Sequence, residues 1–133
     1  MMRPRVFALM LGVPPLASAC GKAEPVRIET EGTLATGDAV LQQDGSYYDE
    51  YRFRAEAGWT ITAVMRSQAF DAYLHLLHDG KQVTSNDDDP SVGRTDAKIT
   101  HVAAESGEYV VLANSYEGQA TGPYRISITA LPP

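Results

Sequence analysis

The sequence holds few of the residues on which disulfide-bonded or nucleic-acid-binding proteins depend. It has one cysteine in 133 residues, so no disulfide can form within the chain. Eleven basic residues stand against 17 acidic ones, which gives a formal net charge of −6. No run of Lys or Arg is present. We therefore expect no nucleic-acid partner, because contacts to a phosphate backbone need a basic surface.

Motifs that would indicate catalysis are also missing. Neither H-E-x-x-H nor G-x-S-x-G occurs in the sequence. The single cysteine, Cys20, lies at the N-terminal end of the chain, which excludes a Cys–His enzyme. We expect a protein without enzymatic activity, and a small hydrolase of an unrecognised type is the least favoured class.

The N-terminal segment has the anatomy of an export signal. Arg3 and Arg5 form a short basic region, and residues 6–17 form an apolar stretch. This stretch is shorter than the ~20 apolar residues that a membrane-spanning helix needs. Small residues then precede Cys20. We predict that residues 1–19 are a signal peptide that is removed on export.

Two export routes are compatible with Cys20. The run L-A-S-A-C resembles a bacterial lipobox, although Leu16 stands one place earlier than that motif prefers. The alternative is ordinary cleavage after Ala17-x-Ala19, which would leave a lone free thiol in an oxidising compartment. We favour lipidation of Cys20, which would anchor the protein to a bacterial membrane. Residues 20–25 would then form a tether between the lipid and the folded domain. A soluble periplasmic or secreted protein is the alternative.

Alternation with a period of two dominates residues 26–133, which we predict to be one domain. Such alternation gives each strand one core face and one solvent face. The alternating segments are separated by Gly, Asp, Asn and Pro, and many short strands with regular turns are typical of a sandwich or barrel. One short segment is weak, so we expect about eight strands, near 26–34, 38–41, 48–55, 58–66, 71–78, 81–85, 97–103, 107–115 and 122–130. We predict a core that contains Tyr51, Phe53, Trp59, Ile61, Leu74, Leu76, Ile99, Tyr109, Val111, Tyr124 and Ile126.

Five short motifs occur in a characteristic order: D-x-Y-x-F at 49–53, F-D-x-Y-L-x-L at 70–76, N-D-D at 86–88, S-G-x-Y-V at 106–110 and G-x-Y at 122–124. In order and spacing the chain resembles the bacterial pre-peptidase C-terminal domain over roughly residues 30–130. That domain is a small β-sandwich usually appended to secreted proteases. The resemblance implies an all-β fold, an antiparallel β-sandwich that is jelly-roll-like.

The resemblance also frames the function. In relatives the domain assists secretion or contacts a polymer such as collagen or polysaccharide, alongside a protease. We therefore expect a non-catalytic binding or accessory module of the cell envelope that contacts a peptide or glycan polymer or assists a secreted peptidase. The alternative is a structural envelope lipoprotein that holds a protein partner.

A cluster of oxygen-bearing side chains suggests a cation site. Asn86, Asp87, Asp88 and Asp89 are consecutive, and Asp96 follows across the same loop. Calcium takes six to eight oxygen ligands, so these residues are our candidate calcium ligands. Asn and Asp also build turns by bonding to their own backbone, which is the competing interpretation. Calcium is the one cofactor that the sequence suggests.

Tyrosine offers a second candidate surface. Tyr47, Tyr48, Tyr73 and Tyr116 fall outside the expected core, and exposed aromatic rings can bind sugars or peptides. The alternative is that tyrosine packs well on the pleated surface of a sheet.

The histidines do not form an obvious metal motif. His75 and His78 are three residues apart, which on a strand places them on opposite faces. His101 stands alone at a position that alternates with Ile99. We therefore expect no metal site made by two histidines.

Overall fold

The computed structural model describes residues 23–87 and 95–133, and within them it contains strands and turns but no helix. None of these described segments is a helix that is long and apolar enough to cross a membrane. The nine strands are β1 (Val26–Leu34), β2 (Ala39–Val40), β3 (Tyr47–Ala55), β4 (Thr60–Arg66), β5 (Ala72–His78), β6 (Lys81–Asn86), β7 (Ala97–Val102), β8 (Gly107–Ser115) and β9 (Gly122–Leu131). The predicted segments are confirmed, and the weak one is β2, which has only two residues.

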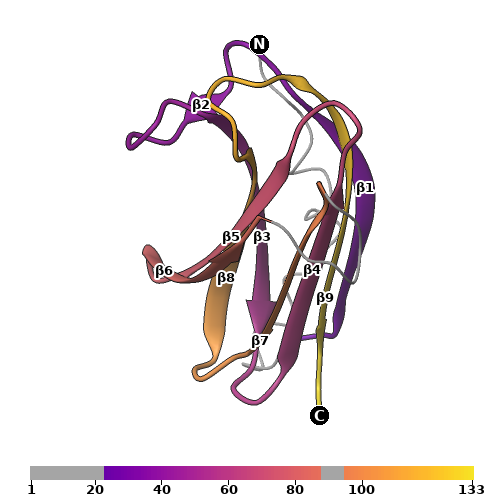
Figure 1. Cartoon of the computed structure of the whole chain (residues 1–133). Coiled ribbons are helices and arrows are strands. Elements are labelled where there is room, and N and C mark those ends of the chain that lie inside the picture. Colours follow the sequence, from indigo (N-terminus) through magenta and orange to yellow (C-terminus); the bar gives the residue numbers. More distant parts are fainter. Residues whose placement is uncertain (1–22, 88–94) are drawn as a thin grey trace.

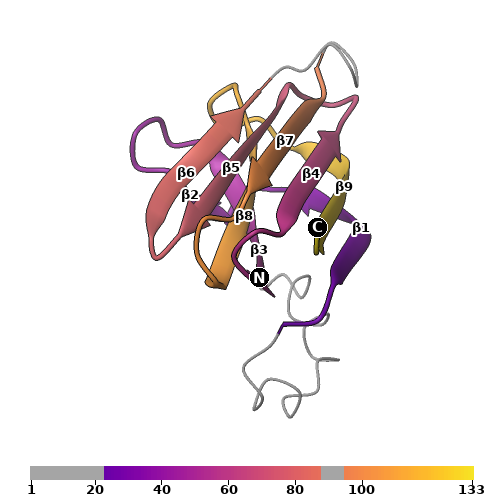
Figure 2. The ribbon, with the colours of Figure 1, turned by 90° about the horizontal axis from the view of Figure 1, so that it is seen from below.

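The strands form two antiparallel sheets packed face to face (Figures 1 and 2). One sheet has the order β1-β9-β4-β7, and the other has the order β2-β3-β8-β5-β6. Without β2, the chain passes from one sheet to the other at every connection except the β5–β6 hairpin, which lies within one sheet. This strand order is that of a jelly roll. The predicted all-β sandwich is therefore confirmed, and β2 is an additional short edge strand beside β3.

Alternating residues of both sheets meet in one core, as the sequence pattern predicts. All eleven residues that we expected to be buried are buried, including Trp59 with 9% of its surface exposed. Along β4 and β9 the alternation is regular, because every second side chain points away from the core.

One buried hydrogen-bonded chain joins two of the motifs. The Tyr124 hydroxyl donates to Asp49 Oδ2 over 2.5 Å, and the Tyr51 hydroxyl lies 2.6 Å from the Tyr124 oxygen. Tyr124 has one proton to give, so Tyr51 is the donor of the second bond. Burial, together with Tyr51 and Asp49, raises the pKa of Tyr124 far above its ordinary value. D-x-Y-x-F and G-x-Y are thus two halves of one polar cluster in the core.

Two glycines permit close contacts, one over the ring of Tyr124 and the other beside Ala69. A Cβ at Gly32 would lie 2.4 Å from the Tyr124 hydroxyl, so only glycine lets β1 pass over that ring. Gly122 has a φ of +139°, and a Cβ there would lie 2.4 Å from the Ala69 Cβ. Both positions therefore favour glycine for steric reasons.

Candidate functional site: the outer face of the five-stranded sheet

The outer face of the five-stranded sheet is the candidate site. β2 and β6 are the two edge strands of this sheet, and in Figure 1 both extend to the left, away from the other sheet. Strand register places outward-facing side chains of neighbouring strands in rows. One row holds Glu50, Leu112 and His75, and the next row includes Val110 and Leu77. Apolar side chains therefore occupy the middle of an outer face, where alternation ordinarily places polar residues.

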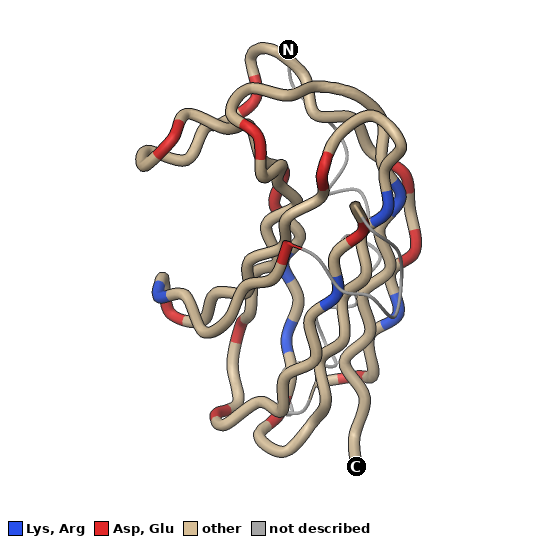
Figure 3. Tube along the Cα trace, in the orientation of Figure 1, with Lys and Arg blue, Asp and Glu red and all other residues tan. Residues whose placement is uncertain are grey.

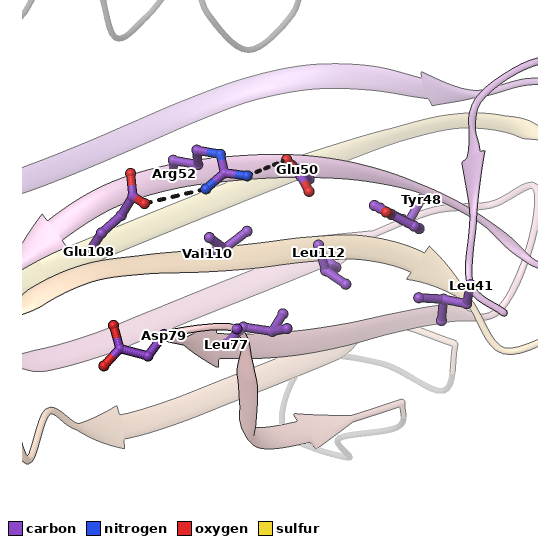
Figure 4. A pocket seen from close by; sticks show the side chains of 10 residues that line it. Leu41, Tyr48, Glu50, Arg52, Leu77, Asp79, Glu108, Val110 and Leu112 are labelled. Atoms are coloured by element: carbon purple, nitrogen blue, oxygen red, sulfur yellow. Dashed lines mark hydrogen bonds and ion pairs between the residues drawn. The ribbon is translucent and has the colours of Figure 1, made fainter. Parts of the chain in front are cut away.

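A groove of about 350 Å³ runs over this face (Figure 4). Its apolar lining comes from three strands and from the loop that follows β2, and its polar lining lies at the margins. The apolar lining comprises Leu41, Leu77, Val110, Leu112 and the ring of Tyr48, and the remaining lining residues are Glu50, Arg52, Asp79, Gly80 and Glu108. An apolar floor with a few polar groups at its edges is typical of a binding site.

Acidic side chains outnumber basic ones along the groove. Arg52 lies between two carboxylates, 3.0 Å from Glu50 and 3.3 Å from Glu108 (Figure 4). These exposed pairs contribute little to stability, about 0–1 kcal/mol each. With Asp79, the lining holds three carboxylates and one guanidinium. The groove is therefore net negative.

The outer face of the other sheet differs in charge. Four basic residues lie along it, separated by threonine and serine, and Figure 3 shows basic positions on this side of the molecule. These residues are Arg27, Arg66, Lys98 and Arg125. Glu29 and Glu31 of β1 face outward on the same sheet, and Glu31 pairs with Arg125 at 3.3 Å. The two outer faces therefore present different surfaces to a partner.

A buried amide holds the loop that forms one wall of the groove. Asn114 is fully buried on β8, and its Nδ2 donates to the Ser46 hydroxyl at 2.9 Å and to the Tyr47 carbonyl at 2.7 Å. Asn114 Oδ1 accepts from His75 Nε2 at 3.3 Å. Ser46 in turn donates its hydroxyl and its backbone N–H to Asp44. This chain fixes the loop that carries Leu41 against the sheet.

The same network affects the pKa of one carboxyl group and fixes the position of one imidazole on this face. The hydrogen bond from the Ser46 hydroxyl, with that from the Ser46 backbone, lowers the pKa of Asp44. His75 is buried, with Nδ1 2.9 Å from Gln82 Oε1 on β6 and its ring 4.4 Å from that of Tyr73. His75 is on β5, which lies between β6 and β8, and its two hydrogen bonds therefore connect these neighbouring strands.

His78 lies at the end of β5, on the opposite face from His75, as predicted. Its Nδ1 donates to the Glu108 carbonyl at 2.9 Å, and its ring stacks on Tyr109 with centroids 4.3 Å apart. Its Nε2 lies 3.1 Å from Glu105 Oε1 and 3.6 Å from Asp79 Oδ2. The bond to the Glu108 carbonyl is the main reason that the pKa of His78 is raised, and Glu105 and Asp79 raise it further.

The four tyrosines that we proposed as an exposed binding surface do not share one face. Tyr48 lines the groove, and Tyr73 faces outward with its ring 5.9 Å from that of Tyr116. Tyr116 is exposed, at 58%. The expectation of exposure is wrong for Tyr47, which packs against the core because the odd-numbered residues of β3 face inward.

The expected calcium ligands are only partly described. Asp88 and Asp89 lie outside the described residues, as does Cys20. Asp96 Oδ1 accepts from the Ser67 backbone N–H at 3.2 Å, and Oδ2 lies 3.4 Å from Arg66. Asp87 is half-buried, and the neighbouring Asn86 Oδ1 is a buried oxygen without a hydrogen-bond partner among the described residues. Calcium binding stays a prediction.

The groove itself was missed by the sequence reasoning, although a signal for it exists. The run Y-V-V-L-A at 109–113 has no polar residue on either face of its strand. In L-H-L-L at 74–77, Leu77 is apolar at a position where alternation predicts a polar, outward-facing residue. Continuous apolar runs indicate a strand that is covered on both faces. Glu108 and Asp79 gave no such signal, because their place at the groove depends on strand pairing.

Comparison with solved structures identifies the fold. PliG of Aeromonas hydrophila, a periplasmic lysozyme inhibitor of g-type lysozyme, superposes with a TM-score of 0.54 and 15% identity, covering 81% of this chain and 87% of PliG. The pre-peptidase C-terminal domain of a Bacillus anthracis collagenase gives 0.52 and 14%, covering 80% and 89%. PliG of Salmonella Typhimurium gives 0.52 and 16%, covering 78% and 86%.

These similarities establish that the chain has the fold of the pre-peptidase C-terminal domain. At such identities the similarity extends to the fold alone. No protein-family model matches the sequence, and no curated protein matches it either. The functional argument therefore depends on the surface of this chain.

Proposed function

We propose that this protein is an exported, non-catalytic module of the cell envelope that binds a protein partner through the outer face of its five-stranded sheet. The observation that carries the proposal is the apolar groove over β3, β8 and β5. Two of the similar structures are periplasmic inhibitors of an enzyme, which supports an envelope setting and a protein partner. The third similar structure is the pre-peptidase C-terminal domain of a collagenase.

The groove favours a particular partner chemistry. Its floor of Val110, Leu112 and Leu77 would bury an apolar side chain, and its net negative lining would attract a positive one. The fitting ligand is a protruding loop of a basic protein that presents an apolar residue next to Lys or Arg. A glycan would instead need many hydrogen-bonding groups and a flat aromatic surface, and only Tyr48 supplies a ring in the groove.

A matched pair of substitutions tests the contact face. Val110 and Val64 are both half-buried valines that face outward from inner strands, one in the groove and one on the opposite sheet. Val110→Glu places a carboxylate in the groove, whereas Val64→Glu makes the same change 46 residues away in sequence on the other outer face. Purified g-type lysozyme is the first probe. The second probe is the protein that is captured in intact cells by a photo-crosslinking residue placed at position 77, on the floor of the groove.

We expect binding of the probe protein to fall at least about tenfold in Val110→Glu, because a carboxylate buried on the apolar floor costs more than about 1.4 kcal/mol. Attraction between this carboxylate and an exposed Lys or Arg of the partner returns only about 0–1 kcal/mol. Val64→Glu should bind as the unmodified chain does. Equal loss in both variants, or none in either, would reject this face as the contact. Sedimentation of the chain with purified peptidoglycan, unaffected by excess protein probe, would favour a glycan ligand instead.

A further inference from the structure

We propose that His78, Asp79 and Glu105 form a site for a first-row transition metal, with Zn²⁺ the preferred ion. The three side chains come from two turns at the same end of the sandwich. His78 and Asp79 lead into the β5–β6 hairpin, and Glu105 lies in the turn between β7 and β8. Their ligand atoms all lie within 4.8 Å of one another.

The spacing of these atoms suits a tetrahedral ion. Zinc bonds of 2.0–2.2 Å to nitrogen and oxygen place neighbouring tetrahedral ligands about 3.3–3.6 Å apart. His78 Nε2 lies 3.1 Å from Glu105 Oε1 and 3.6 Å from Asp79 Oδ2. Two edges of the tetrahedron are therefore close to their final length before any ion binds. Three protein ligands leave the fourth position open to water.

The imidazole is also held as a metal ligand requires. Its Nδ1–H donates to the Glu108 carbonyl, which directs Nε2 toward the two carboxylates. Metal-binding histidines commonly have such a partner on the other ring nitrogen, which fixes both tautomer and orientation. The ring stacks on Tyr109, and a Cβ on Gly107 would lie 3.0 Å from its Cε1. The position of Nε2 is thus set by the sheet rather than by a mobile side chain.

The donor set selects among metals. One imidazole nitrogen and two carboxylate oxygens suit zinc better than calcium or magnesium, which prefer oxygen ligands alone. The site requires none of the acidic residues at 86–89. Because Asp79 also lines the groove, a bound dication would offset negative charge at that end of the groove.

Calorimetric titration of the full chain with ZnCl₂, CaCl₂ and MgCl₂ tests the proposal. The chain carries Cys20→Ser so that its thiol does not compete for zinc. We expect one saturable Zn²⁺ site, weakened at least about tenfold by Glu105→Gln or His78→Gln. His101→Gln and Glu31→Gln, which alter a half-buried histidine and an exposed glutamate elsewhere, are the matched controls and should bind as the parent does.

Cobalt gives an independent readout. Co²⁺ at this site should show the intense visible absorption of tetrahedral coordination, and Glu105→Gln should abolish it. Glu105 is exposed at 69% of its side chain, so its substitution leaves the fold intact. The proposal is overturned if no saturable zinc site exists, if Glu105→Gln and His101→Gln bind zinc equally, or if calcium binds this site more tightly than zinc.

Discussion

The buried hydroxyl of Tyr124 allows a sharp test of how the core is held together. Tyr124→Phe removes the donor to Asp49 Oδ2 and the acceptor for the Tyr51 hydroxyl while leaving the ring in place. A hydrogen bond to a charged group contributes about 1.5–3 kcal/mol, and leaving a buried partner unpaired adds to the loss. We expect a fall of about 2–3 kcal/mol in the free energy of unfolding, or roughly 10 °C in Tm.

Urea unfolding followed by the fluorescence of Trp59, the only tryptophan, measures this change. Two other tyrosines serve as graded controls. Tyr109→Phe removes a hydroxyl that donates to the Glu105 carbonyl at 2.6 Å, and should cost about 1 kcal/mol. Tyr116→Phe alters an exposed ring and should stay within about 0.5 kcal/mol of the parent. Equal values for Tyr124→Phe and Tyr116→Phe would refute the structural role of the buried chain.

The same substitution should alter the dependence of stability on pH. The pKa of Tyr124 is raised in the folded state, so the unfolded chain releases this proton first, above pH ~10. The protonated Tyr124 hydroxyl therefore contributes fully to the stability of the fold below pH ~10. This contribution is lost as pH rises further, because the unfolded state then binds fewer protons than the folded state. Stability of Tyr124→Phe should fall less steeply above pH ~10 than that of the parent. An unchanged slope would show that Tyr124 ionises normally in the fold.

Three further predictions follow from other parts of the chain. Asn114→Ala should lower stability by about 2–3 kcal/mol in urea unfolding, because it removes the donor to the buried Ser46 hydroxyl and to the Tyr47 carbonyl; a change under about 0.5 kcal/mol would contradict this. Millimolar calcium should raise Tm by several degrees if the acidic loop binds it, magnesium much less, and Asp87→Ala with Asp89→Ala should abolish the difference; identical melting with calcium and with chelator would favour a turn-forming role. Cys20→Ser should release the protein from membranes or leave the precursor uncleaved, and mass spectrometry of the N-terminal peptide should show a diacylglyceryl adduct only in the parent.

Period-two alternation made the fold predictable from the sequence. Where a strand has one face exposed to solvent, as in β4 and β9, the alternation of apolar and polar residues indicates which side chains are buried. Trp59, Ile61, Tyr124 and Ile126 are therefore in the core as expected. Turn residues located the ends of the strands equally well, because glycine and aspartate supply the backbone conformations that hairpins need.

The candidate site could be predicted only in part, because its geometry depends on contacts between distant strands. Leu77 and Val110 are neighbours through β5–β8 pairing, which no local pattern reveals. Glu105 reaches His78 from another hairpin, 27 residues away. Tyr47 was misplaced because a tyrosine at the start of a strand gives no sign of which face it occupies. Strand register, rather than composition, decides each of these cases.

The most direct test of the proposed function is the comparison of Val110→Glu with Val64→Glu in binding to a purified partner protein. Both variants should keep the Tm of a folded domain, which separates loss of binding from loss of structure. We predict that binding falls at least about tenfold in Val110→Glu and is unchanged in Val64→Glu. Undiminished binding by a folded Val110→Glu chain would contradict the assignment of the groove as the binding face.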